Sequence, residues 1–257
     1  MYQAPTYVWA AILLATIGIP LLAVVALYRG ALAARMPRRT ATRLAVVAAS
    51  ALGGWLVATS LLASSGIYGR TVPAVELPVV TAAAVGVLVA LLGATTIPVV
   101  SRSLSAPGSL ARLALAQTPR VEGFVFLILL AQGALPAAFA WPAAVGDMAT
   151  GLAAPLVAWR LAKGGGRRLA VWFNLFGLAD LLNAVTLGVL IGLGVLAVSP
   201  GAQALAVLPL ALVPTLAVPV AITLHVVSLR RLLAGVGGKD QPASMPIPAG
   251  EPATLRP

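Results

Sequence analysis

A carboxylate and two carboxamides lie within an apolar run in the last third of the chain. Asn174, Asp180 and Asn183 belong to the segment VWFNLFGLADLLNAVTLGVLIGLGVL (171–196), which is long enough to cross a bilayer. Exposing an ionised aspartate to lipid near mid-membrane costs at least about 2.5–3.5 kcal/mol. We therefore expect Asp180 to face the interior of a helix bundle, to be protonated, or both.

Helical spacing gathers the polar residues of this segment. At about 100° per residue, Asn174, Asp180 and Asn183 share one half of the helix with small residues, while bulky apolar residues occupy the other half. Asn183 lies three residues after Asp180 and is expected to hydrogen-bond it. Two interpretations follow: a proton-accepting or ligand-binding carboxylate, or an interhelical brace. The first is favoured, because an amide brace would avoid the cost of a carboxylate.

Other polar residues lie in neighbouring apolar segments and are candidates to join Asp180. By depth, we expect Gln132 at the midplane with Asp180 and Asn183, Asp147 near the outer end, and Glu122, Asn174 and His225 near the cytoplasmic ends. The sequence thus predicts a ladder of ligand- or proton-binding groups: Asp180, Asn183, Asn174, Gln132, Asp147, His225 and Glu122.

Three of these residues have a structural alternative. Glu122 could pair with Arg120 at the membrane interface. Asp147 could be the N-cap of a helix, since carboxylates satisfy the first free amides there. His225, the only histidine, could be a pH switch or could cap carbonyls at the end of its helix.

The elements that position these groups must be membrane-spanning helices. Hydrophobic residues make up 60% of the 257 and charged residues 9%, against about 25% charged in soluble domains. Seven segments are long enough to span: roughly 7–28, 44–64, 75–100, 121–141, 143–162, 169–197 and 203–229. The fourth and fifth are expected to be separated by a corner at Trp141-Pro142. The predicted fold is a single all-α integral membrane domain (1–234) with seven transmembrane helices and a disordered cytoplasmic tail (235–257).

The distribution of Lys and Arg predicts the orientation. Basic residues concentrate in cytoplasmic loops, and the seven-span arrangement places all of them except Arg70 on one side. The N-terminus is then outside and the C-terminus in the cytoplasm. We attribute the net charge of +11 to this bias and to contacts with membrane lipids, and expect no nucleic acid partner. Arg far outnumbers Lys in an Ala-rich chain, which suggests a bacterial inner (plasma) membrane protein.

The last predicted span carries a proline every five residues. Pro209, Pro214 and Pro219 each lack an amide hydrogen, so the carbonyls four residues earlier, among them that of Thr215, lose their helical partners. Such carbonyls must be satisfied by protein or by a water-filled cavity. We expect either a binding site beside a broken helix or a kinked packing helix.

Motifs do not identify a reaction. The chain has no cysteine and one histidine, which excludes thiolate metal sites and paired-histidine zinc motifs, and we find neither a nucleophile elbow nor a phosphate-binding loop. We assign no cofactor and favour a non-enzyme. The expected function is a transporter or a protein that binds a small polar or lipidic ligand, at a midplane site between spans four to seven with a functional Asp180. The alternatives are an accessory or assembly subunit, and an enzyme that modifies a lipid or isoprenoid by carboxylate acid–base chemistry.

Overall fold

Helix is nearly the only regular structure in the part of the chain that the structure describes, because apolar segments in a membrane must satisfy their backbone groups within the segment. The computed structural model describes residues 3–72 and 77–234, and the predicted disordered tail lies outside them. The first elements are α1 (Thr6–Ala33), α2 (Arg38–Ser64), the 3-10 turn η1 (Ile67–Gly69), the two-residue antiparallel strands β1 (Thr71–Val72) and β2 (Leu77–Pro78), α3 (Val79–Ala94) and α4 (Pro98–Ser105).

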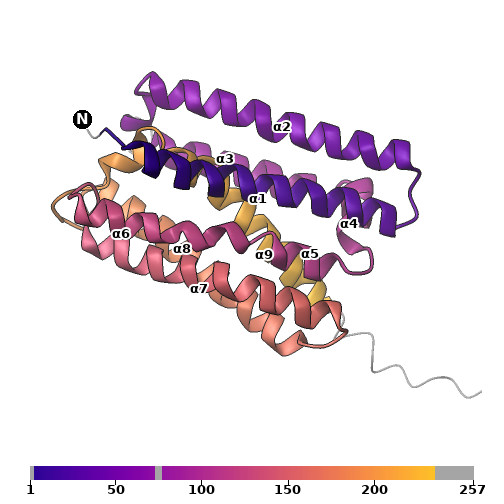
Figure 1. Ribbon diagram of the computed structural model, residues 1–257. Coiled ribbons are helices and arrows are strands. Elements are labelled where there is room, and N and C mark those ends of the chain that lie inside the picture. The colour runs from indigo at the N-terminus through magenta and orange to yellow at the C-terminus, as the bar shows by residue number, and fades with distance from the viewer. Residues whose placement is uncertain (1–2, 73–76, 235–257) are drawn as a thin grey trace, which may run out of the picture.

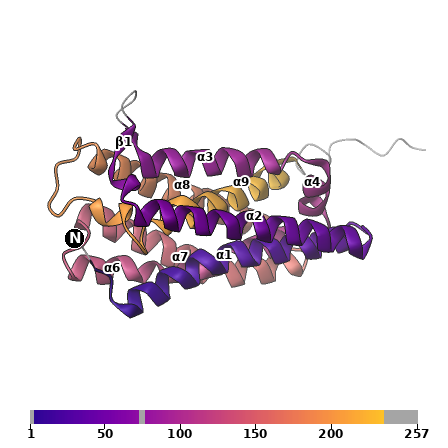
Figure 2. The same ribbon diagram turned by 90° about the horizontal axis from the view of Figure 1, so that it is seen from above.

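The second half carries the polar residues. It consists of α5 (Ser109–Leu115), the 3-10 segment η2 (Thr118–Gly123), α6 (Phe124–Ala131), α7 (Ala137–Ala162), α8 (Arg167–Gly192), the 3-10 turn η3 (Gln203–Ala206), the π-helical turn η4 (Val213–Ala217) and α9 (Val218–Ala234). These elements run roughly parallel to one long axis, with α4 turned across one end (Figures 1 and 2).

Several helices are long and apolar enough to cross a membrane, which fits a multi-pass membrane protein. Five candidate spans are found in the described residues: Thr6–Ala33, Arg38–Ser64, Ser109–Ala131, Arg167–Gly192 and Val213–Ala234. The pair α3 and α4 becomes a sixth if it counts as one span, although it bends by 80° between Ala94 and Pro98. The predicted third span therefore ends in a sharp bend. The all-α class is confirmed.

α9 is the central helix of the bundle. In the most apolar 18 residues of its span, Val213–Ala234, 72% of the residues are buried inside the protein. The corresponding share for α2 is 6%. It packs against α8 and α3 and also contacts α5 and α1. In Figure 1, α9 passes behind α1 and α5, between the upper helices α1, α2 and α3 and the lower helices α6, α7 and α8. Side chains on α9 can therefore meet those of both groups of helices.

The predicted boundary between the fourth and fifth spans is wrong. The chain reverses at residues 132–136, where Gly133 has a φ of +65°, and α7 continues through Trp141-Pro142. Pro142 is the sixth residue of α7, so the helix continues without the one amide-to-carbonyl hydrogen bond that this position would otherwise donate. The candidate span that overlaps the predicted fourth one is Ser109–Ala131 instead of 121–141. This shift moves Arg120 and Glu122 from the expected membrane surface to the middle of a span.

The prolines of the last span loosen the start of the helix. Pro214 lies in the π-helical turn η4, and regular α-helix begins only at Val218. The carbonyl of Thr215, four residues before Pro219, accepts a hydrogen bond from the indole Nε1 of Trp55 at 2.8 Å. A side chain of α2 thus satisfies one of the carbonyls that the proline spacing was predicted to free.

Candidate functional site

Arg120 lies at the centre of a buried polar network. Its Nε donates to Asp147 Oδ1 at 2.6 Å and its Nη2 donates to Asp180 Oδ2 at 2.5 Å. The side chain of Arg120 is 2% exposed and that of Asp180 is 8% exposed. The two carboxylates come from α7 and α8, so one guanidinium joins three segments of the chain. Such charge-assisted bonds are the strongest hydrogen bonds in proteins.

Arg120 reaches this position because the helix that carries it is broken. Pro119 has no amide hydrogen and Gly123 has no side chain, and between α5 and α6 the backbone forms the 3-10 segment η2. η2 lies directly against α7. The break places two charged residues, Arg120 and Glu122, inside the bundle instead of at its surface.

His225 and Asn174 extend the network on the other side of Arg120. Arg120 Nη1 and His225 Nε2 are 3.0 Å apart, and His225 Nδ1 is 2.9 Å from Asn174 Oδ1. A guanidinium only donates, so Nε2 accepts and the proton of the neutral ring is on Nδ1, which donates to Asn174. The amide of Asn174 then donates to the carbonyl of Ala170 at 2.7 Å. We call Arg120, Asp147, Asp180, His225 and Asn174 the Arg120 cluster.

Two glycines allow the helices of the cluster to approach one another. A Cβ on Gly146 of α7 would lie 1.7 Å from Asp180 Oδ1. A Cβ on Gly177 of α8 would lie 2.4 Å from His225 Nε2 and 3.2 Å from Arg120 Nη1. The observed geometry therefore requires glycine at both positions.

A large cavity leads to two members of the cluster. It has a volume of about 720 Å³, and both Asp147 and Asp180 line it. Side chains such as those of Phe139, Val185 and Leu205 form apolar walls. Residues 68–71, the 132–134 turn and η3 also line it, and they bring Arg70, Thr71, Gln132 and Gln203 to the cavity. Pockets of 300–1,000 Å³ with mostly apolar walls and few polar groups are typical of small-ligand sites.

A chain of hydroxyl groups begins at Tyr68, which lines the same cavity. Thr59 donates to Thr215 Oγ1 at 2.9 Å and Thr215 donates to the carbonyl of Ala211 at 2.6 Å. The 2.6 Å contact between Thr59 and the Tyr68 hydroxyl is therefore donated by Tyr68. Burial raises the pKa of the Tyr68 phenol. This chain fixes α2 and η1 to the broken start of the last span.

The net charge of the cluster is set by three groups. His225 is neutral in the observed hydrogen-bond pattern, and Arg120 carries one positive charge. With both aspartates ionised the cluster carries one excess negative charge, which one proton or one bound cation would neutralise. No group of three or more His, Cys, Asp or Glu that could hold a metal ion occurs in the described part of the chain.

A comparison with known families gives one match. A family model matches residues 77–233, which is more than half of the chain. The chain belongs to this family, described as a domain of unknown function (DUF8737). No curated protein and no solved structure matches the chain.

The DUF8737 match contains every member of the Arg120 cluster, and four of the five were predicted from the sequence. Asp147, Asp180, Asn174 and His225 do converge. The predicted ladder of three depths is wrong, however, because one guanidinium contacts Asp147, Asp180 and His225 directly. The role of these residues in proton or ligand binding stays a prediction.

Three predicted site residues are not members of the cluster: Asn183, Gln132 and Glu122. Asn183 is exposed and makes no hydrogen bond to Asp180 among the described contacts. Gln132 follows the last turn of α6, lines the large cavity, and donates to the Tyr7 hydroxyl at 2.6 Å. It is therefore at the end of a span instead of the midplane, because this span ends at Ala131, ten residues before the predicted end at 141.

The structural alternatives for the other residues are also resolved. Glu122 does not pair with Arg120, whose partners are Asp147, Asp180 and His225. Asp147 lies inside α7 and is not an N-cap. The ring of His225 bonds Arg120 and Asn174 instead of capping carbonyls.

Sequence reasoning missed Arg120. The string QTPRVEG (117–123) contains proline, glycine and two charges, which is the composition of a loop. The available signal was the need for a counter-ion, since two intramembrane carboxylates are rarely left without one. Arg120 is the last basic residue before the apolar run of α6.

Proposed function

We propose that this DUF8737 protein is a transporter or ligand-binding protein of a bacterial inner membrane, in which the Arg120 cluster binds a proton or the cationic group of a small ligand. The single observation that carries the proposal is one buried guanidinium shared by two carboxylates at the inner end of the 720 Å³ cavity. A structural ion pair needs only one carboxylate. The second carboxylate gives the site a place for one exchangeable positive charge.

The same proposal includes seven membrane crossings. α7 is not among the candidate spans by hydropathy, but its 26 residues extend about 39 Å at 1.5 Å per residue, enough to cross a hydrocarbon core of about 30 Å. Its polar residue Asp147 lowers its hydropathy and is paired inside the bundle. With α3 and α4 as one bent span, the N-terminus is outside and the C-terminus cytoplasmic.

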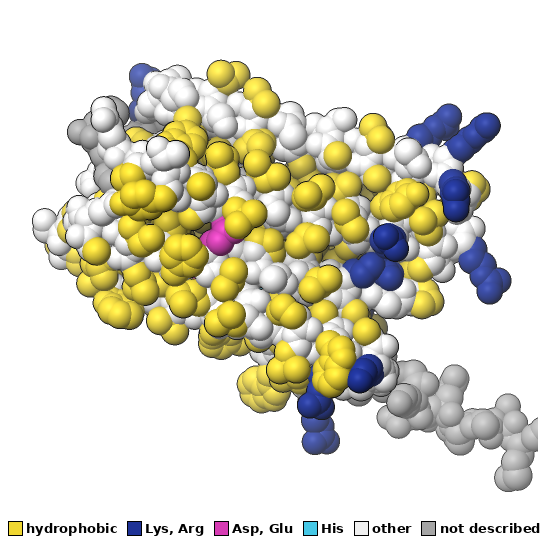
Figure 3. All heavy atoms as spheres, viewed as in Figure 1, with side chains coloured by type: hydrophobic (Ala, Val, Ile, Leu, Met, Phe, Trp, Pro, Cys, Tyr) yellow, Lys and Arg dark blue, Asp and Glu magenta, His cyan; other side chains and the backbone are white. Residues whose placement is uncertain are grey.

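The charges support this orientation. Lys and Arg side chains gather toward one end of the molecule in Figure 3, while the middle of that face is almost wholly apolar. This end carries the turn between α1 and α2, with Arg35, Arg38 and Arg39. The large cavity is lined by elements of the opposite end, including η1 and η3, and thus opens toward the outside in this topology.

The walls and the charge of the cavity define the ligand class. Apolar side chains line most of its length, and the carboxylates at its inner end favour a positive group. We infer a small amphipathic cation, such as an amine with an apolar body. Proton and amine would compete for the excess negative charge, so binding should weaken as the pH falls.

The test uses alkylammonium ions as probes. Purified protein in nanodiscs is titrated with butyl- to octylammonium chloride, with the alcohols of equal chain length as uncharged controls, and the thermal unfolding midpoint is recorded. A ligand at a hundred times its Kd stabilises the bound state by about 2.7 kcal/mol, so the amine should raise the midpoint of the wild type. Asp180→Asn keeps the shape but removes the excess charge, and should abolish the shift.

The alcohols separate charge recognition from partition into lipid or detergent. They should act equally on the wild type and Asp180→Asn. An equal shift of both proteins by the amine, or no shift of the wild type, would contradict the proposal. If Asp180→Asn binds the amine as the wild type does, Asp180 is a brace and not a functional carboxylate.

A further inference from the structure

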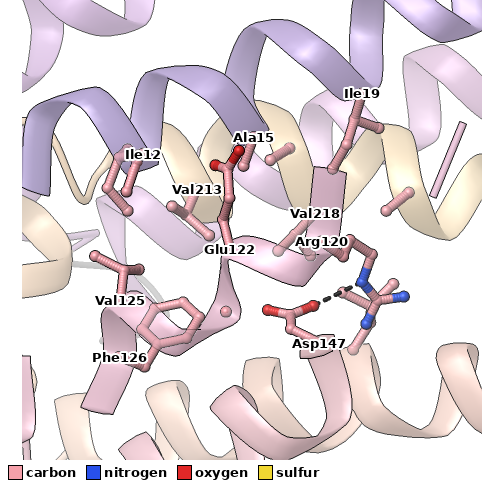
Figure 4. A pocket seen from close by; sticks show the side chains of 15 residues that line it. Ile12, Ala15, Ile19, Arg120, Glu122, Val125, Phe126, Asp147, Val213 and Val218 are labelled. Carbon is pink, nitrogen blue, oxygen red and sulfur yellow. Dashed lines mark hydrogen bonds and ion pairs between the residues drawn. The ribbon is translucent and has the colours of Figure 1, made fainter. Parts of the chain in front are cut away.

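Glu122 is a buried carboxylate that the Arg120 cluster does not use. It is 5% exposed, and no described side chain makes a hydrogen bond with its carboxylate oxygens. It extends from η2 toward α1, near the backbone of Ala15, while the Arg120–Asp147 pair lies on its other side (Figure 4). Because an unpaired charge is costly in apolar surroundings, a carboxylate in this position needs a proton or a polar partner.

A small cavity joins Glu122 to Asp147. It has a volume of about 40 Å³, and Glu122, Arg120 and Asp147 line it. One water molecule needs a cavity of about 10–15 Å³ of probe-occupied volume and two to four polar partners. The two carboxylates and the guanidinium supply those partners, so the cavity has room and chemistry for a bridging water.

Asp147 borders both cavities. It lines the large cavity together with Asp180, and it lines the small cavity together with Glu122. Asp180 does not line the small cavity, and Glu122 does not line the large one. Among these three carboxylates, Asp147 is therefore the one that can exchange a proton on both sides.

The other elements around Glu122 contribute no titratable group. The small cavity is lined from α1 by Ala11, Ile12, Ala15 and Ile19, from α6 by Val125 and Phe126, and from the last span by Val213, Ala217, Val218 and Ala221. Leu181 of α8 is also apolar. The proton affinity of Glu122 is thus coupled to Arg120 and Asp147 within the described part of the chain.

We infer that Glu122 is a second proton-binding site, filled from the large cavity through Asp147. Protonated Asp147 gives its proton to a water molecule in the small cavity, and that water gives one of its protons to Glu122. Asp147 is left as a carboxylate paired with Arg120, so the number of protons and the total charge are unchanged. The inference rests on the proposed exchange of protons at the Arg120 cluster and adds where the proton goes.

Infrared difference spectroscopy of the purified protein tests this inference without a transport assay. The chain has three glutamates, Glu76, Glu122 and Glu251, so a carbon-13 label on glutamate identifies their protonated-carboxyl band. The band should shift with the label and disappear in Glu122→Gln. It should persist in the matched controls Glu76→Gln and Glu251→Gln.

The coupling to Asp147 has its own readout. The hydrogen–deuterium exchange of the Glu122 band should be slower in Asp147→Asn, because the amide cannot relay a proton, while Asp180→Asn should leave the band present. If Glu122→Gln fails to fold, the labelled double variant Glu76→Gln/Glu251→Gln isolates the same band. The inference is overturned if no glutamate band responds to pH, or if Asp147→Asn leaves the exchange rate unchanged. Neither result depends on amine binding, so it is distinct from failure at Asp180.

Discussion

Arg120 and Asp180 meet across 60 positions of sequence, with Arg120 Nη2 and Asp180 Oδ2 2.5 Å apart. The same guanidinium also binds Asp147. Arg120 thereby ties η2 to α7 and α8, three elements that hydropathy alone would treat as separate apolar segments. Its charge is the reason why two carboxylates can be close together inside the bundle.

Arg120→Gln should therefore be strongly destabilising. Removing one partner of a buried ion pair costs about 3–5 kcal/mol, and here two carboxylates lose their counter-ion. The double variant Arg120→Gln/Asp180→Asn should lose less than the sum of the single losses, because it removes one of the stranded charges. Reversible unfolding of the four proteins in mixed micelles measures this coupling. Additive losses would show that Arg120 and Asp180 do not stabilise each other.

The sequence predicted the helices better than their breaks. Composition and the length of apolar runs determine that a segment is a helix in lipid, and these were sufficient for the all-α class. A break depends on whether another helix supplies partners for polar groups. QTPRVEG therefore resembles a loop, although Arg120 finds its partners on α7 and α8. Trp141-Pro142 shows the opposite error. It resembles a corner in the sequence, but α7 continues through it.

The site was predictable by residue type but not by depth. Asp180, Asp147, Asn174 and His225 were selected because polar groups in apolar segments are costly unless they are paired. Their common level in the bundle depended on the true start of the fourth span, which shifted by twelve residues relative to 121. Asn183 was assigned from helical spacing, which gives a face but not the neighbour that covers it, and that position is exposed.

Trp55→Phe tests the contact between α2 and the broken last span. The indole donates to the carbonyl of Thr215, which Pro219 deprives of its helical donor, and a buried acceptor without a partner costs about 1–3 kcal/mol. We expect a loss of that order in thermal unfolding. The control Trp172→Phe removes an indole that is 71% exposed and should change stability by less than about 0.5 kcal/mol. An equal loss of stability in the two variants would show that the hydrogen bond from Trp55 to Thr215 does not stabilise the protein.

Single cysteines test the topology. The chain has no cysteine, so Ser65→Cys, Ser105→Cys and Gly165→Cys each give one reactive thiol at an exposed position. An impermeant maleimide should label the first only from outside and the other two only from the cytoplasmic side. Labelling of Gly165→Cys from outside would mean that α7 does not cross the membrane, and the seven-span proposal would fail.

Gly146→Ala tests whether the packing of α7 against α8 holds Asp180 in place. The new methyl carbon would lie 1.7 Å from Asp180 Oδ1, so the carboxylate must turn away from Arg120 or the helices must separate. Overpacking of this kind costs about 1–3 kcal/mol. Stability should fall, and the response to alkylammonium ions should be lost as in Asp180→Asn.

Two comparisons separate this effect from a general intolerance of alanine. Gly53→Ala lies within α2, where a Cβ would meet nothing within 4 Å, and it should be neutral or more stable by about 0.5–1 kcal/mol because alanine favours helix. In Asp180→Ala/Gly146→Ala the colliding carboxylate is absent, so the second substitution should cost far less than it does alone. If Gly146→Ala destabilises both backgrounds equally, the close contact with Asp180 is not what requires glycine at this position.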